Sequence, residues 1–174
     1  MKKFIPDFSV IAKTNWGKPN IDTKNKMWLV MAVAAVLMVV FVFIPWETVT
    51  VSIGSMSETG SRLGITTWFG ILGLISALGA VYGVFYKNLQ FVFCGALLAA
   101  VMGLIGWLTI VDVTNNGETM TAEEIKLATS SVGSSVASAF GAKISVGHIG
   151  AILFLVASLV AAGVSFLQIK NENK

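Results

Sequence analysis

The chain has 174 residues, the length of one domain, but 55% of them are hydrophobic and only 12% are charged, with a mean hydropathy of +0.81. This composition lies outside the range of ordinary soluble domains and indicates an integral membrane protein. The net charge of +3 gives no reason to expect a nucleic-acid partner, because the excess of lysines lies beside the predicted membrane segments.

Four apolar stretches are predicted to cross the bilayer as helices, since none contains Asp, Glu, Lys, Arg or His and a span needs roughly 20 residues. The predicted spans are residues 27–44, 66–86, 89–111 and 149–169. The first has only 18 residues, but Pro45 and Trp46 extend it into the interface, where Trp is common.

The basic residues lie mainly on one side of the predicted membrane. Nine of the twelve Lys and Arg residues fall in residues 1–26, at Lys87 and in residues 170–174, whereas the outer segments 45–65 and 112–148 hold three, together with six acids. Since Lys and Arg are enriched in cytoplasmic segments, both termini are predicted to be cytoplasmic. With no cleavable leader and no Asn-x-Ser/Thr sequon, we expect a bacterial cytoplasmic membrane.

The first outer segment is predicted to form a β-hairpin. Residues 48–53 alternate polar and apolar side chains, residues 54–60 favour turns, and residues 61–65 are predicted to return as a second, shorter strand. A two-stranded hairpin is marginal alone, so its apolar side chains should pack on the second outer segment or on another protein. The candidate partner contacts are Trp46, Val49, Val51, Ile53, Glu58 and Arg62.

Small residues recur on one face of each of the last three predicted spans. Such faces let membrane helices approach closely, and packing within the bundle is a simpler interpretation than a surface for a partner helix. The candidate packing residues are Gly73, Ser76, Ala80, Gly83, Gly95, Ala99, Gly103, Gly106, Ala157 and Ala161.

The second outer segment is predicted to contain one amphipathic surface helix over residues 122–140. Thr121 and Glu124 have the spacing of a capping box at its start. Apolar residues then recur at helical spacing through Val132, Val136 and Phe140, opposite a serine-rich face. We expect this helix to lie across the bundle and to cover the hairpin.

The sequence offers little chemistry for catalysis. The predicted spans hold no Asp, Glu, Lys, Arg or His, and Cys94 has no second cysteine to pair with. Asp112 and His148 lie at outer span ends and could form a pair, although interfacial anchoring is the simpler interpretation. No catalytic residue, metal ligand, cofactor or small-molecule substrate is predicted.

An outer β-segment that follows the first of four predicted spans and begins near Trp46 resembles the layout of the claudin and PMP22-type tetraspan proteins. Leu63, Gly64 and Trp68 are loosely similar to a second motif of that family, whereas the two cysteines of its first outer segment are missing here. The resemblance implies contact with other molecules through the outer segments.

The predicted fold class is therefore an all-α membrane protein. It would be a four-transmembrane-helix bundle with a small extracytoplasmic β-hairpin between spans one and two and an amphipathic surface helix between spans three and four. We expect a non-catalytic accessory or scaffold subunit that binds a larger membrane complex, or itself, through its outer segments and small-residue helix faces. The alternatives are a small oligomeric channel or transporter component, and a membrane immunity or protective protein.

Overall fold

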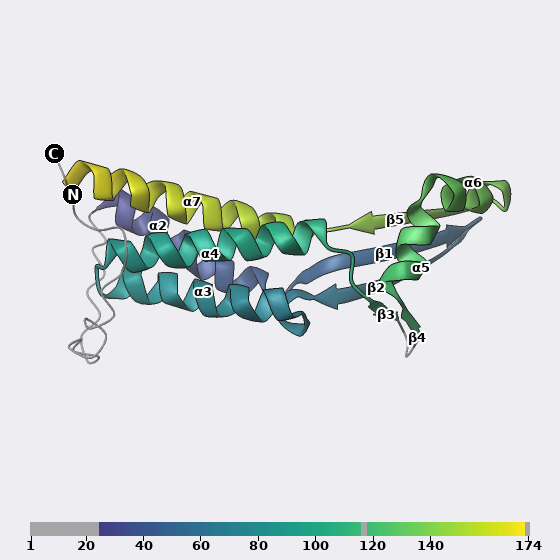
Figure 1. Ribbon diagram of the computed structural model, residues 1–174, viewed down its shortest axis with the longest axis horizontal. Coiled ribbons are helices and arrows are strands. Elements are labelled where there is room, and N and C mark those ends of the chain that lie inside the picture. The colour runs from purple at the N-terminus through teal and green to yellow at the C-terminus, as the bar shows by residue number, and fades with distance from the viewer. Residues whose placement is uncertain (1–24, 116–117, 173–174) are drawn as a thin grey trace.

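The computed structural model describes residues 25–115 and 118–172, so the predicted N-terminal segment 1–26 falls almost entirely outside the described residues (Figure 1). The described chain forms two parts that follow one another along the long axis of the molecule. One is a bundle of long helices, and the other is a β-sheet with two short helices that extends from one end of the bundle.

The bundle contains helices α2 (Lys26–Phe41), α3 (Trp68–Phe85), α4 (Leu89–Leu108) and α7 (Ile149–Glu172). Helix α4 packs between α3 and α7, while α2 packs mainly on α7 and α3. Three of these helices are long and apolar enough to cross a membrane, namely Trp68–Phe85, Leu89–Leu108 and Ile149–Asn171. The 16 residues of α2 make it shorter than these three.

Side-chain caps fix where the bundle helices begin. The Thr67 side chain accepts a hydrogen bond from the Gly70 amide at the start of α3. Asn88 does the same for the Gln90 and Phe91 amides at the start of α4. Lys87 turns the chain between these two helices with a φ of 52°. Each cap satisfies backbone donors that have no partner within their own helix.

The extension is built on a five-stranded antiparallel sheet with the strand order β4-β3-β2-β1-β5. Its strands are β1 (Pro45–Ile53), β2 (Met56–Leu63), β3 (Val113–Asn115), β4 (Glu118–Met120) and β5 (Ala142–Gly147). A two-residue connection joins β1 to β2, with Gly54 at a φ of +60° that glycine adopts readily. Strand β5 follows the short helices α5 (Ala122–Thr129) and α6 (Ser131–Ala139) and pairs with β1.

The two faces of the sheet differ in character. On one face, Ile125 of α5 is fully buried against Val49 and Val113. Alternation along the strands puts hydroxyl side chains on the opposite face. By the strand register these residues are Thr48, Thr50, Ser52, Ser57, Thr59, Ser61, Thr114, Thr119 and Ser145. The sheet therefore has one face with an apolar cluster under α5 and one face of mainly hydroxyl side chains, on which Lys143 lies opposite Ser52.

The predicted fold class, an all-α protein with a four-span bundle, is wrong. The described residues contain three helices of spanning length rather than four, and the outer segments form a five-stranded sheet instead of a lone hairpin. Strands β3, β4 and β5 come from the segment that was expected to be mainly helical. They complete the apolar face that an isolated β1–β2 hairpin would have left in water.

The single surface helix predicted over residues 122–140 is also wrong, because two helices replace it. Ser130 has an extended backbone, with φ −64° and ψ 163°, and its hydroxyl accepts a hydrogen bond from the Gly133 amide. Serine competes with helical hydrogen bonding in this way and therefore ends α5 and begins α6. The capping box of Thr121 and Glu124 is present at the start of α5.

Candidate functional site

The sheet joins the helix bundle at Trp46, which is only 2% exposed. Trp46 is the extra residue of a β-bulge, since Pro45 pairs with Leu63 and Glu47 already pairs with Arg62. The bulge directs the indole into the bundle, where its ring centroid lies 5.0 Å from that of Phe154. The indole N–H donates a 2.8 Å hydrogen bond to the Phe41 carbonyl at the end of α2.

Three glycines from separate segments leave room for this indole. A Cβ added to Gly106 of α4 would lie 2.6 Å from the Trp46 ring, and one added to Gly64 would lie closer still. A Cβ on Gly150 of α7 would lie 2.9 Å from Trp46 Cδ1. We call the space between Gly64, Gly106 and Gly150 the indole slot. It fixes the sheet to two bundle helices at once.

Glu47 follows directly and is also buried, at 2% exposure. Its Oε2 accepts a 2.7 Å hydrogen bond from the Val111 amide, just beyond α4, whereas Oε1 is buried without a hydrogen-bond partner. Burial raises the pKa of Glu47, and the Val111 hydrogen bond and the charge of Arg62 offset part of this rise. The carboxyl group thus holds the start of the second outer segment against β1.

His148 lies between β5 and α7 on the other side of β1. Its imidazole hydrogen-bonds the backbone of Trp46, while Nδ1 is buried without a partner. Burial lowers the pKa of His148, and the bond to Trp46 opposes this effect. We refer to Glu47 and His148, with the neighbouring Arg62 and Asp112, as the junction cluster.

Arg62 and Asp112 of this cluster bind the backbone. The Arg62 guanidinium donates to the carbonyls of Asp112 and Thr66, at 3.0 and 3.2 Å. The Asp112 carboxylate accepts a 2.8 Å bond from the Ala122 amide at the start of α5. The Asp112–His148 pair considered from the sequence is thus replaced by separate backbone partners for each residue.

A second candidate site lies at the end of the extension farthest from the bundle, where Figure 1 shows α6 beside the ends of β1, β2 and β5. Large apolar side chains of these elements and of α5 are exposed there, up to 79% for Met56 and 80% for Phe140. The set, which we call the distal apolar surface, comprises Ile53, Met56, Leu127, Val132, Val136 and Phe140. Exposed apolar groups of this size are typical of interaction sites.

The predicted partner contacts divide between the interior and the surface. Trp46 and Val49 are buried, and Val51 is half-buried under α5. Arg62 is half-buried in the junction cluster, so Ile53 and Glu58 are the two that are exposed. Sequence reasoning did not single out Met56, which is one of the most exposed apolar side chains. It also missed the burial of Glu47, although Glu47 is in phase with Val49 and Val51 on the apolar face of β1.

The candidate packing residues lie inside the bundle. Nine of the ten are buried, and Ser76 is half-buried. A Cβ on Gly95 would lie 2.7 Å from the backbone nitrogen of Ala80, and one on Gly83 would lie 2.5 Å from that of Val92. These glycines therefore set the close approach of α3 and α4.

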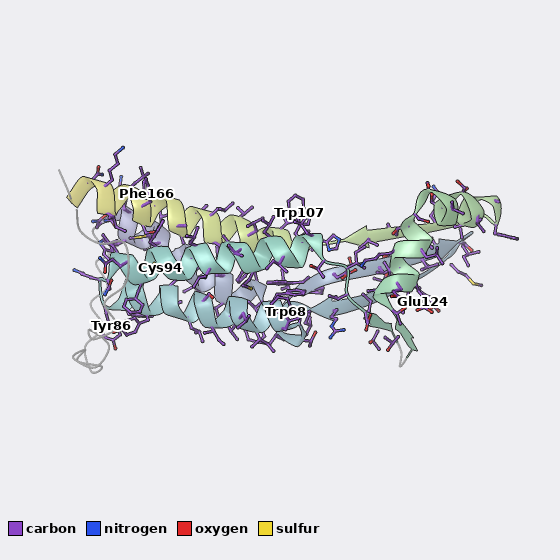
Figure 2. All side chains as sticks on the ribbon, viewed as in Figure 1. Trp68, Tyr86, Cys94, Trp107, Glu124 and Phe166 are labelled. Carbon is purple, nitrogen blue, oxygen red and sulfur yellow. The ribbon has the colours of Figure 1, made fainter. Side chains whose placement is uncertain are left out.

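Aromatic residues mark the ends of the bundle. Figure 2 shows Trp68 and Trp107 at the end that meets the sheet, and Tyr86 at the opposite end. Both tryptophans are exposed, at 61% and 43%. Within the described residues, no three His, Cys, Asp or Glu side chains gather in a way that could hold a metal ion.

Comparison with known proteins gives no family assignment. No protein-family model matches the chain, and no curated protein or solved structure matches it. The likeness to claudin and PMP22-type proteins therefore stays a prediction, and function has to be argued from the chain itself.

Proposed function

We propose that this chain is a non-catalytic accessory or scaffold subunit of a bacterial cytoplasmic membrane, which binds a partner protein through the distal apolar surface. The observation that supports this most is the exposure of six large apolar side chains at the end of the extension away from the bundle. Side chains such as Phe140 and Met56 lose unfavourable contact with water when a partner covers them.

The position of the distal apolar surface argues against the surrounding bilayer as its partner. Strand β1 begins at the bundle and runs for nine residues. At a rise of about 3.3 Å per residue, its far end stands about 30 Å beyond the helices. Trp68 and Trp107 lie at the near end, where aromatic residues favour the membrane interface. The partner therefore has to reach the extension from outside the membrane.

The lack of charge in the distal apolar surface indicates which kind of partner surface can bind it. Residues 127–142, from Leu127 through the whole of α6, contain no charged residue. A charged partner surface would lose hydration here without gaining an ion pair. The proposal therefore calls for a complementary apolar patch on the partner protein. The bundle holds the subunit in the membrane, with both termini in the cytoplasm as the positions of the lysines favour.

Site-specific photocrosslinking tests this proposal. A photoreactive amino acid at position 140 or 56 should crosslink one defined protein in intact cells, whereas the same group at Ser145, on the hydroxyl face of the sheet, should not. The double variant Met56→Ser/Phe140→Ser should reduce co-purification of that protein at least tenfold in mild detergent. Equal crosslinking from position 145, or full co-purification with the double variant, would show that the distal apolar surface is not the contact.

A further inference from the structure

The distal apolar surface is small for a contact between two freely diffusing proteins. It presents six large apolar side chains, whereas a standard interface takes roughly 20–30 residues from each partner. Two proteins anchored in one membrane are confined to a thin layer, which raises their effective concentration and lets a small surface hold them together. The size of this surface therefore favours a partner that is anchored in the same membrane.

The height of the surface above the bundle narrows the choice further. The nine residues of β1 carry it about 30 Å beyond the helices, at about 3.3 Å per residue. A second copy of this chain, anchored by the same helices, presents the same surface at the same height. The two copies are then related by a two-fold axis along the membrane normal, and two-fold symmetry is the commonest symmetry of homo-oligomers.

The lack of charge in the surface suits a contact between two identical copies. Residues 127–142 contain no charged residue, so two copies meet here without repulsion between like charges. Lys126 and Lys143 border this stretch, and Glu58 lies close to Met56 in the sequence. Charges at the border of a contact stay in water and contribute little to affinity. An uncharged apolar surface is therefore complementary to its own copy.

Helix α6 has the side-chain pattern that a second helix can pack against. Val132, Val136 and Phe140 recur four residues apart, so they share one side of the helix, and all three are exposed. Ser135 and Ala139 lie beside them and are small and exposed. Because small side chains let two helix axes come close together, the same side of a second α6 fits here.

We propose that the partner at the distal apolar surface is a second copy of this chain, with the α6 helices of the two copies side by side. This inference rests on the proposed function, since it names the partner of the same surface. Val136, the middle residue of the exposed side of α6, lies beside its own counterpart across the two-fold axis. The assembly is a closed dimer, which leaves neither copy of the surface in water.

Disulfide formation in intact membranes tests this proposal on the full chain. Cys94 is the only cysteine, so each variant is made together with Cys94→Ala. Val136→Cys should give a disulfide-linked dimer on mild oxidation. Ser134→Cys is the matched control, because this exposed residue lies on the opposite side of the same helix, and it should give much less dimer.

Co-purification tests the same contact without a disulfide. Two differently tagged copies of the wild type should co-purify in mild detergent. Met56→Ser/Phe140→Ser in both copies should reduce this co-purification by roughly tenfold or more, because large apolar side chains are then no longer available for burial. Both positions are exposed in the single chain, so the variant should fold.

The outcomes separate this inference from the proposed function. If Val136→Cys gives no dimer while a photoreactive group at position 140 captures a different protein, the second copy is not the partner, although the surface still binds one. If neither variant gives a product, the dimer and the proposed function both fail. Equal amounts of dimer from Ser134→Cys and Val136→Cys would mean that random collisions form the disulfide, and this too would overturn the dimer.

Discussion

Similar side chains are buried at the junction and exposed at the far end of the extension. Trp46 and Phe140 both lie in polar outer segments, yet Trp46 is 2% exposed and Phe140 is 80% exposed. The difference arises from what other parts of the chain supply. Gly64, Gly106 and Gly150 make room for the indole, whereas no described segment covers Phe140. An aromatic residue in an outer segment therefore stabilises the fold in one place and is available for binding in another.

The largest expected loss of stability comes from removing the indole of Trp46 from the indole slot. Trp46→Ala removes a buried ring and its hydrogen bond to Phe41, so we expect the free energy of unfolding to fall by about 3–5 kcal/mol. Thermal unfolding in mild detergent measures this change. Trp68→Ala, which removes a 61% exposed indole, is the control and should cost much less. Equal losses from the two variants would mean that burial of Trp46 does not matter.

Placing a methyl group of α4 in the indole slot should give the second largest loss of stability. Gly106→Ala places a Cβ 2.6 Å from the Trp46 ring, and such overpacking costs about 1–3 kcal/mol. Gly79→Ala is the matched control within a bundle helix, because a Cβ there meets nothing within 4 Å and alanine favours helix. Gly106→Ala should therefore lower the midpoint of thermal unfolding, whereas Gly79→Ala should raise it.

The pH dependence of stability should distinguish the two titratable residues of the junction. The folded protein holds the pKa of His148 below 6.5, so stability falls as the pH drops below 6.5, and His148→Gln should remove this loss. The folded protein holds the pKa of Glu47 above 4.5, so stability falls as the pH rises above 4.5 and through the raised pKa.

Glu47→Gln should therefore be more stable than the wild type at pH 8 and indistinguishable from it at pH 4. Unfolding midpoints measured between pH 4 and pH 8 test both residues. If the unfolding midpoints of the wild type and of the two variants changed in the same way with pH, this prediction would be contradicted.

The smallest effect on stability should come from the distal apolar surface. Phe140→Ala removes a side chain that is 80% exposed, so the free energy of unfolding should change by less than about 0.5 kcal/mol. Thermal unfolding of the purified subunit without its partner measures this. A loss as large as that of Trp46→Ala would mean that Phe140 packs within the fold rather than serving a partner.

The long helices could be predicted because a charge-free apolar run is visible within one segment. Strand β1 could also be predicted from a single segment, since the alternation of its polar and apolar residues is local. Strand β5 was missed, although Ile144 and Val146 alternate with polar residues, because the strand is short and bounded by glycines. Strands β3 and β4 have three residues each, too few for a pattern.

The junction could not be predicted, because its parts lie far apart in the sequence. Glu47 meets Val111 across 64 positions, and Thr48 meets Gly147 across 99. The exposed side of α6 was visible as the spacing of Val132, Val136 and Phe140, but that spacing was interpreted as the buried side of the helix. Periodicity identifies an apolar stripe and does not say whether the protein itself covers it.

The connections between the two parts of the molecule have a mechanical consequence. Three residues separate α2 from β1, and His148 alone separates β5 from α7. Strands β1 and β5 are neighbours in the sheet, and helices α2 and α7 pack against each other in the bundle. The chain thus passes between the bundle and the extension twice, side by side, through connections of three residues and of one residue. A sideways load applied by a partner at the far end is delivered to α2 and α7 as a tilt, with the extension acting as a lever arm.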